Sequence, residues 1–233
     1  MKTVLITGAS RGIGRATTLA LAEENTSFDR LVLVGRAGAA FEETAAQAKA
    51  LGRGKEIVVI EADLDNPEIV TAIFAQIDTL GIKLHAIVNN AGFTKPASLN
   101  ETLQADFERT MRVNLYSPFR IIQAAVVENH PLEQIINIAS TAGMNGRAGW
   151  LSYSASKAAM INMSEVLRDE LKPYGIEVIC LSPGRCATDL RRTLAPNEDP
   201  TTIMQPEQVA EIIKFMTSDT GKLLHSQNLV VRT

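Results

Sequence analysis

The chain has 233 residues, of which 45% are hydrophobic and 21% are charged, and its formal net charge is −3 at pH 7. This composition is typical of a globular protein and excludes a disordered or collagen-like chain, while the acidic balance argues against binding to nucleic-acid phosphates. No hydrophobic run approaches the roughly 18 residues that a membrane-spanning helix needs.

Short hydrophobic runs alternate with longer stretches of helical pattern along the whole chain. The predicted strands are residues 3–7, 31–35, 57–61, 86–89, 134–139, 177–181 and 228–231, and the predicted helices are residues 12–24, 39–51, 67–80, 103–128, 153–173 and 206–217. Runs rich in Val, Ile and Leu without strict alternation are typical of parallel strands buried on both faces. We therefore predict an α/β fold with a doubly wound parallel sheet, formed by residues 1–233 as a single domain. The polar segment 183–200 resembles a mobile connection.

The first strand leads into a glycine-rich turn, Thr7-Gly8-Ala9-Ser10-Arg11-Gly12-Ile13-Gly14, which opens the first helix. Glycines in such a turn let the pyrophosphate of a dinucleotide approach the backbone N–H groups at the start of a helix. A tight structural turn is the alternative. The position between a strand and a helix favours dinucleotide binding.

The end of the second strand indicates which dinucleotide binds. About 20 residues after the glycines, an NAD site usually carries an acidic residue that binds the ribose 2′-hydroxyl. This sequence has Arg36 there, and Arg11 lies in the glycine-rich turn. Both guanidinium groups could pair with a 2′-phosphate, so we predict NADP(H), against the alternative that both are solvated loop residues.

Two more strand ends border the expected crevice. Asp63 ends the third strand, where its carboxylate could accept from an adenine amino group or cap the next helix. The fourth strand ends in Asn89-Asn90-Ala91-Gly92, whose small residues leave room for a ribose but also suit an ordinary turn.

Tyr153 and Lys157 are four residues apart on one face of a predicted helix. A desolvated ammonium group, together with a positively charged oxidised nicotinamide, could lower the pKa of the phenol, which would then act as general acid and base on a carbonyl group. Ser140 ends the fifth strand, where its hydroxyl could stabilise an oxyanion. An amphipathic helix and an ordinary turn serine are the alternatives.

Asn114 stands in the middle of the predicted helix 103–128, where an amide side chain is unfavourable. It could bend the helix around a bound water molecule or cap a local irregularity.

Together and in this order, the turn 7–14, the segment 89–92, Asn114, Ser140, the Tyr153/Lys157 pair and Pro183-Gly184 resemble the short-chain dehydrogenase/reductase family. The resemblance covers nearly the whole chain and is closest to NADP-dependent 3-oxoacyl-reductase-like members. It implies a single-domain Rossmann fold with seven parallel strands and helices on both faces. It also implies that Asn114, Ser140, Tyr153 and Lys157 are catalytic. The cofactor site that it implies consists of Gly8, Ser10, Arg11, Gly12, Ile13, Gly14, Arg36, Asp63, Leu64, Asn90, Ala91, Gly92, Tyr153, Lys157, Pro183, Gly184 and Thr188.

The resemblance also implies a homo-oligomer. Members of the family often finish with a strand, Asp-Gly-Gly and a short tail, whereas this sequence ends at Asn228-Leu229-Val230-Val231-Arg232-Thr233. The sequence therefore leaves a homodimer and a homotetramer open.

The substrate is expected to be a small molecule with a carbonyl or secondary alcohol group, covered by a lid at about residues 184–204. A ketoacyl thioester is one candidate, although the stretch 128–133 lacks the basic residues that would dock an acidic carrier protein. A phosphorylated sugar or another small anionic ketone is the other, since Arg185, Arg191 and Arg192 of the lid could bind an anion. A non-catalytic NADP(H)-binding sensor is the alternative from another class.

The remaining predictions concern metals and location. Two cysteines, Cys180 and Cys186, are too few for a disulfide framework, and His85, His130 and His225 are scattered, so no metal site is expected. The N-terminus lacks a signal-peptide core. We expect a cytoplasmic enzyme that binds neither nucleic acid nor membranes.

Overall fold

A computed structural model describes residues 1–224 and 228–232, so His225 and Thr233 lie outside the described residues. Seven strands form one parallel sheet in the order β3-β2-β1-β4-β5-β6-β7. They are β1 (Thr3–Thr7), β2 (Arg30–Gly35), β3 (Glu56–Glu61), β4 (Ala86–Asn89), β5 (Gln134–Ile138), β6 (Glu177–Pro183) and β7 (Asn228–Val231). The order reverses between β1 and β4. In a doubly wound sheet, such a switch point opens a crevice beyond the carboxyl ends of the strands.

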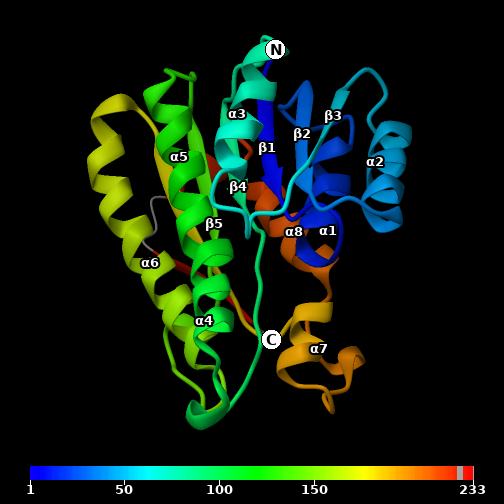
Figure 1. The fold of residues 1–233 in the computed structure, drawn as a ribbon. Coiled ribbons are helices and arrows are strands. Elements are labelled where there is room, and N and C mark those ends of the chain that lie inside the picture. The colour runs from blue at the N-terminus through cyan, green and yellow to red at the C-terminus, as the bar shows by residue number, and fades with distance from the viewer. Residues whose placement is uncertain (225–227, 233) are drawn as a thin grey trace.

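Helices cover both faces of this sheet (Figure 1). They are α1 (Gly12–Ala22), α2 (Ala39–Leu51), α3 (Ile69–Thr79), α4 (Gln104–Met111), α5 (Ser117–Val127), α6 (Leu151–Leu171), α7 (Asp189–Leu194) and α8 (Pro206–Met216). The fold class predicted from the sequence, a seven-stranded Rossmann fold with a doubly wound parallel sheet, is confirmed.

Successive residues of the strands pack into two separate cores. Val4 and Ile6 of β1 join a cluster with residues of α1, α2 and α8. Leu5, between them, joins a second cluster with residues of α3, α5 and α6. Because neighbouring side chains of a strand point to opposite faces, both faces must be hydrophobic, which explains the unbroken hydrophobic runs in the sequence.

The predicted helix 103–128 is interrupted. A π-helical turn, Arg112–Tyr116, separates α4 from α5, and Asn114 lies inside this turn with no exposed surface. A π-turn adds a residue to the helical repeat and redirects the side chains around it. The local irregularity expected at Asn114 is therefore a π-turn within a helical stretch that continues from α4 into α5, and its carboxamide is directed into the protein.

The segment that resembled a mobile connection, 183–200, also differs from the expectation. It contains α7 and is followed by a 3₁₀ turn, Pro200–Thr202. The Thr188 hydroxyl caps α7 by accepting a hydrogen bond from the N–H of Arg191 at 3.1 Å. In Figure 1, α7 extends below the sheet, on the same side as the start of α4. The threonine cap was the available sequence signal for this short helix.

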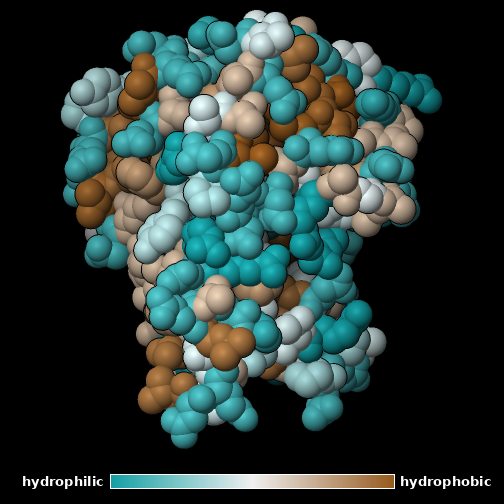
Figure 2. Space-filling model, in the orientation of Figure 1, coloured by the Kyte–Doolittle hydropathy of each residue, from teal (hydrophilic) through white to brown (hydrophobic). Residues whose placement is uncertain are grey.

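The molecular surface seen in Figure 2 is mostly hydrophilic over its centre; hydrophobic side chains gather at the upper right, over the region of β2 and β3, and in smaller groups at the lower end, near the start of α4. Leu99 and Leu103, which precede α4, are largely exposed. Among the described residues, no helix is both long enough and hydrophobic enough to cross a membrane.

Candidate active site

A pocket opens at the carboxyl ends of the strands, on the switch point between β1 and β4. Its wall combines residues that are far apart in the sequence, from the glycine-rich turn to α7. Nearly all the predicted site residues lie on this wall: Gly8, Ser10, Arg11, Gly12, Ile13, Arg36, Asp63, Leu64, Asn90, Ala91, Gly92, Ser140, Tyr153, Lys157, Pro183, Gly184 and Thr188. Two predicted residues, Gly14 and Asn114, lie beneath the wall.

The glycine-rich turn is held against the end of β4 by a group of short hydrogen bonds. The Thr7 hydroxyl accepts from the backbone N–H groups of Asn90 and Ala91, both at 3.0 Å. The Asn90 carboxamide donates to the carbonyl oxygens of Thr7 at 2.9 Å and Gly8 at 3.3 Å. A Cβ atom on Gly14 would stand 2.1 Å from the Gly8 oxygen, so only glycine allows α1 to begin this close to β1. Gly14 thus shapes the turn from beneath.

The tip of β2 carries the charge pattern expected for a phosphate. Arg36 follows Gly35, the last residue of β2, is exposed and lies on the pocket wall. Arg11 lies on the same wall, but its guanidinium group is 3.5 Å from the Asp189 carboxylate of α7. Both side chains of that pair are more than half exposed, so the pair is weak and can open.

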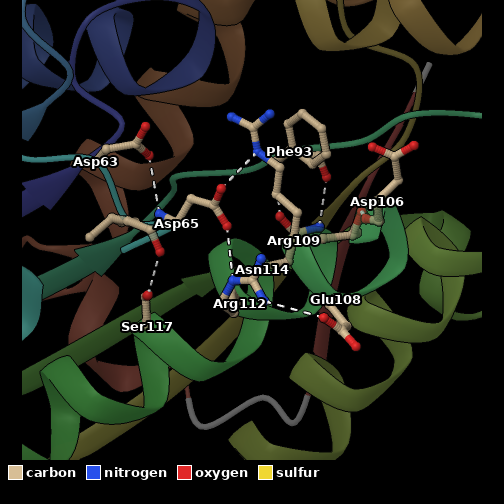
Figure 3. A network of polar contacts seen from close by, with 11 residues as sticks. Asp63, Asp65, Phe93, Asp106, Glu108, Arg109, Arg112, Asn114 and Ser117 are labelled. Atoms are coloured by element: carbon tan, nitrogen blue, oxygen red, sulfur yellow. Dashed lines mark hydrogen bonds and ion pairs between the residues drawn. The ribbon is translucent and has the colours of Figure 1, made fainter. Parts of the chain in front are cut away.

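Asp63 and Leu64 form the wall beyond β3. The Asp63 carboxylate accepts from the backbone N–H of Asp65 at 3.1 Å and does not cap α3, which begins at Ile69. Asp65 binds Arg109 at 3.2 Å and Arg112 at 2.9 Å, as Figure 3 shows. The contacts of Asp65 tie the turn after β3 to α4 and to the π-turn that follows it. The helix-cap alternative for Asp63 is excluded, because its carboxylate is bound within its own turn.

Ser140, Tyr153 and Lys157 meet at the other end of the pocket. Ser140 begins a 3₁₀ turn, Thr141–Gly143, that lies directly on α6. A Cβ atom on Gly143 would stand 2.5 Å from the carbonyl carbon of Lys157, so this glycine lets the end of β5 contact the backbone of α6. The contact brings the Ser140 hydroxyl near enough to the Tyr153 phenol to act on its pKa.

Burial controls the protonation of the two groups on α6. It raises the pKa of Tyr153, while the Ser140 hydroxyl and the positive charge of Arg191 act in the opposite direction. Burial lowers the pKa of Lys157 to about 8. From the sequence, Lys157 together with a bound oxidised nicotinamide is expected to lower the pKa of Tyr153. In the structure the Lys157 ammonium group donates to the Ile138 carbonyl at 2.7 Å and lies 5.9 Å from the phenol ring centre.

Asn114 acts on the backbone next to the pocket. Its carboxamide oxygen accepts from the N–H of Phe93 at 2.8 Å, and its nitrogen donates to the carbonyl oxygen of Phe93 at 3.0 Å and to the Ser156 hydroxyl at 2.9 Å. Ser156 in turn donates to the Tyr153 carbonyl oxygen at 2.8 Å. Asn114 therefore joins the segment after β4 to the first turn of α6.

The lid residues are paired with one another. Arg191 makes two hydrogen bonds to the Glu198 carboxylate, at 2.5 and 2.7 Å, and Arg185 lies 3.5 Å from the same group. Arg192 is directed to Asp189, 3.5 Å away, and is largely exposed. Of the three lid arginines, Arg185 and Arg191 reach the pocket wall.

Several wall residues were not predicted. Phe93, Arg109 and Val113 line the pocket beside Leu64, and Arg147 lines it beside Trp150. Arg109 stacks on the Phe93 ring, with its guanidinium carbon 4.2 Å from the ring centre. These residues lie in loops or on a helix, where no pattern in a single sequence marks them. Thr7, by contrast, immediately precedes the glycines and could have been found as their anchor.

Among the described residues, no group of three or more His, Cys, Asp or Glu side chains is placed to hold a metal ion. Cys186 lies on the pocket wall and burial raises its pKa to about 12, so its thiol stays protonated.

The fold and this pocket define a nucleotide-binding α/β protein, and three comparisons specify its relatives. The family model for short chain dehydrogenases matches residues 2–199. A 3-oxoacyl-[acyl-carrier-protein] reductase from Synechocystis sp. is 33% identical over 224 residues, which cover 92% of this chain and 88% of that protein.

Two solved structures share the fold closely. A short chain dehydrogenase from Burkholderia cenocepacia in complex with NADP has a TM-score of 0.84 at 28% identity, with 99% of this chain and 96% of that one covered. A blue fluorescent protein from a metagenomic library, in complex with NADPH, has a TM-score of 0.85 at 28% identity and the same coverage. The chain belongs to the short-chain dehydrogenase/reductase family and is an oxidoreductase, as predicted from its motifs.

The contact of Gly143 with α6 can be tested by adding one methyl group. Gly143→Ala is expected to lower the free energy of unfolding by about 1–3 kcal/mol, because its Cβ meets the backbone of α6. Gly146→Ala is the matched control, since a Cβ at Gly146 meets nothing within 4 Å, and its effect should stay within about 0.5 kcal/mol. Urea unfolding followed by circular dichroism measures both, and equal stabilities would contradict the proposed contact.

Proposed function

We propose that this protein is an NADPH-dependent reductase of a small carbonyl substrate, with residues 1–233 as one domain and residues 184–204 as its lid. One observation carries the proposal: Ser140, Tyr153 and Lys157 meet on a wall that continues to the glycine-rich turn and to Arg36. A proton donor and a dinucleotide cradle in one pocket are what the transfer of a hydride and a proton to a carbonyl group requires.

The residues present fit NADP(H). The turn from Gly8 to Gly14 exposes its backbone at the start of α1, where a pyrophosphate is stabilised by N–H groups. Arg36 and Arg11 supply positive charge where the 2′-phosphate is expected, and the residue that follows β2 is this arginine in place of the acidic residue that favours NAD. The two solved relatives that bind NADP or NADPH support this assignment. When bound, NADPH supplies the hydride.

Arg36 allows a direct test of this cofactor assignment. In Arg36→Asp, a carboxylate replaces the guanidinium group, so the ratio of kcat/KM for NADPH to that for NADH should fall about tenfold or more. Arg53→Asp, at an exposed arginine away from the pocket, should leave the ratio unchanged. Initial rates with both cofactors measure the ratios. A wild-type preference for NADH would contradict the assignment.

The proton chemistry follows from the environment of Tyr153. Because burial raises its pKa, the phenol is protonated at neutral pH and can donate to the carbonyl oxygen of the substrate. The Ser140 hydroxyl, which lies on the same wall and acts on the pKa of the phenol, can donate to the same oxygen as negative charge develops on it. Lys157, at a pKa of about 8, is mostly charged at neutral pH and stabilises the phenolate that remains. Asn114 is a positioning residue, because its hydrogen bonds hold the backbone of Phe93 against Ser156 of α6.

Tyr153→Phe tests the reaction itself. Without the phenol hydroxyl, kcat for ketone reduction should fall about 10²–10⁴-fold, whereas NADPH should still bind. Tyr174→Phe, at a largely exposed tyrosine, is the matched control and should keep full activity. Turnover with a ketone panel and titration of NADPH fluorescence give the two readouts. Unchanged turnover in Tyr153→Phe would exclude the mechanism, and a wild type that binds NADPH but reduces nothing would favour the sensor alternative.

The pKa of Lys157 predicts a pH profile. As pH rises through about 8, the buried ammonium group loses its proton and with it the charge that stabilises the phenolate. The value of kcat/KM for reduction should therefore be level below about pH 7 and fall above about pH 8. Lys157→Arg, which stays charged, should be slower but lack this descending limb. A wild-type profile that stays level to pH 10 would contradict the role of Lys157.

Two substrate classes fit the pocket. The similarity to a 3-oxoacyl-[acyl-carrier-protein] reductase supports a ketoacyl thioester. The basic residues at the outer end of the pocket support a small anionic ketone. The homodimer or homotetramer and the cytoplasmic location remain predictions.

A further inference from the structure

The outer end of the pocket gathers positive charge. Arg147, Arg185 and Arg191 all line it there, and the carboxylate that contacts two of them is Glu198. Among the described residues, no carboxylate lies within 4.0 Å of Arg147. Asp189, which also lines the pocket, pairs with Arg11 and Arg192. Arg147, Arg185 and Arg191 therefore share only the carboxylate of Glu198 among their ion pairs in the described residues, which leaves a net positive charge on this part of the wall.

Trp150 joins two of these arginines. The guanidinium carbon of Arg147 lies 5.3 Å from the centre of the Trp150 ring, and that of Arg191 lies 5.5 Å from it. Trp150 directly precedes α6, and the loop that carries it is fixed by a backbone hydrogen bond from Ala97 to Gly149 at 2.9 Å. The ring is thus a fixed surface against which both cations rest.

Arg191 is oriented by its contact with Glu198. Its side chain is 14% exposed, and Nε and one Nη2 hydrogen are used by the carboxylate. A guanidinium group has five N–H donors, so two on Nη1 and one on Nη2 remain, and these form a second flat edge. Within the described part of the chain, no hydrogen-bond acceptor contacts that edge. Glu198 therefore holds Arg191 with a free donor edge.

Arg191 is also close to the reacting groups. Its charge lowers the pKa of Tyr153, although less than burial raises it, and both residues line the same pocket. A substrate whose carbonyl oxygen meets Tyr153 and Ser140 would bring only its nearest atoms to Arg191. A negative group on the same small substrate could then meet Arg191, because all three residues line one pocket.

We propose that Arg191, held by Glu198 and assisted by Arg147 across the Trp150 ring, binds the anionic group of a small keto acid or keto phosphate. Guanidinium edges match carboxylate and phosphate oxygens in pairs, which makes arginine suited to this role. The indole ring shields the substrate's short carbon chain from water. That this anion also carries a carbonyl group rests on the proposed function.

The alternative occupant is an acidic carrier protein bound from outside. Arg185 is 50% exposed and Arg192 is 76% exposed, so both could contact such a partner. Arg191 is different, because it is enclosed between Glu198 and Trp150 and lines the pocket. Because Arg191 lines the inside of the pocket, a small anion fits this site better than a carrier protein that binds from outside.

Paired substrates test the anion site. Wild type, Arg191→Met and Arg192→Met would be assayed with NADPH on acetoacetate and its ethyl ester, and on dihydroxyacetone phosphate and dihydroxyacetone. We expect wild type to prefer the charged member of at least one pair by about tenfold or more in kcat/KM. Arg191→Met should lose most of this preference, and Arg192→Met, on the same helix but off the pocket wall, should keep it.

A binding measurement separates this inference from the proposed function. Calorimetry would titrate 3-hydroxybutyrate, its methyl ester and glycerol 3-phosphate into the enzyme–NADPH complex, where no turnover occurs. Charge-dependent binding in wild type that is lost in Arg191→Met supports the anion site even if no ketone is reduced. Turnover without charge preference in either pair, or equal losses for charged and neutral substrates in Arg191→Met, would overturn it. So would reduction of the neutral acetoacetyl thioester of N-acetylcysteamine at a higher kcat/KM than either anion.

Discussion

The site depends on how closely the ends of β1 and β4 approach each other. Neighbouring strands of a parallel sheet would normally carry their connections to the same face, but here the chain leaves β1 and β4 in opposite directions. Thr7 and Asn90 join the two ends through side-chain to backbone hydrogen bonds, and Gly14 lets α1 begin against them. These bonds satisfy backbone groups of Thr7, Asn90 and Ala91 within the two strand ends. The crevice lies between the two connections that leave these ends.

A second close approach positions the residues of α6 that face the pocket. Gly143 lets the turn after β5 rest on α6, and Asn114 holds the other side of α6 through Ser156. Between these contacts Tyr153 is buried and protonated, while Lys157 keeps most of its charge at neutral pH. The same burial that raises the pKa of an acid lowers the pKa of a base, so one environment prepares both groups.

The sequence predicted the seven strands well because parallel strands buried on both faces need long runs of β-branched and aliphatic residues. It predicted most of the wall, since each motif follows a strand and must therefore reach the crevice. It placed Asn114 at an irregularity inside a helix but did not show that the irregularity is a π-turn, and it missed α7. A π-turn looks like ordinary helix in sequence, and a six-residue helix is stabilised by its cap and by contacts with distant segments more than by its own residues.

By itself, the sequence determined the fold class, the family, the dinucleotide turn and the Tyr153/Lys157 pair, because these follow from local spacing and from patterns of burial. The tertiary structure decided which charges meet. Local spacing does not specify the contacts of Arg11 with Asp189, of Asp65 with Arg109 and Arg112, or of Arg191 with Glu198 and Trp150. Pairing energies depend on distance and burial, and both exist only once the chain has folded.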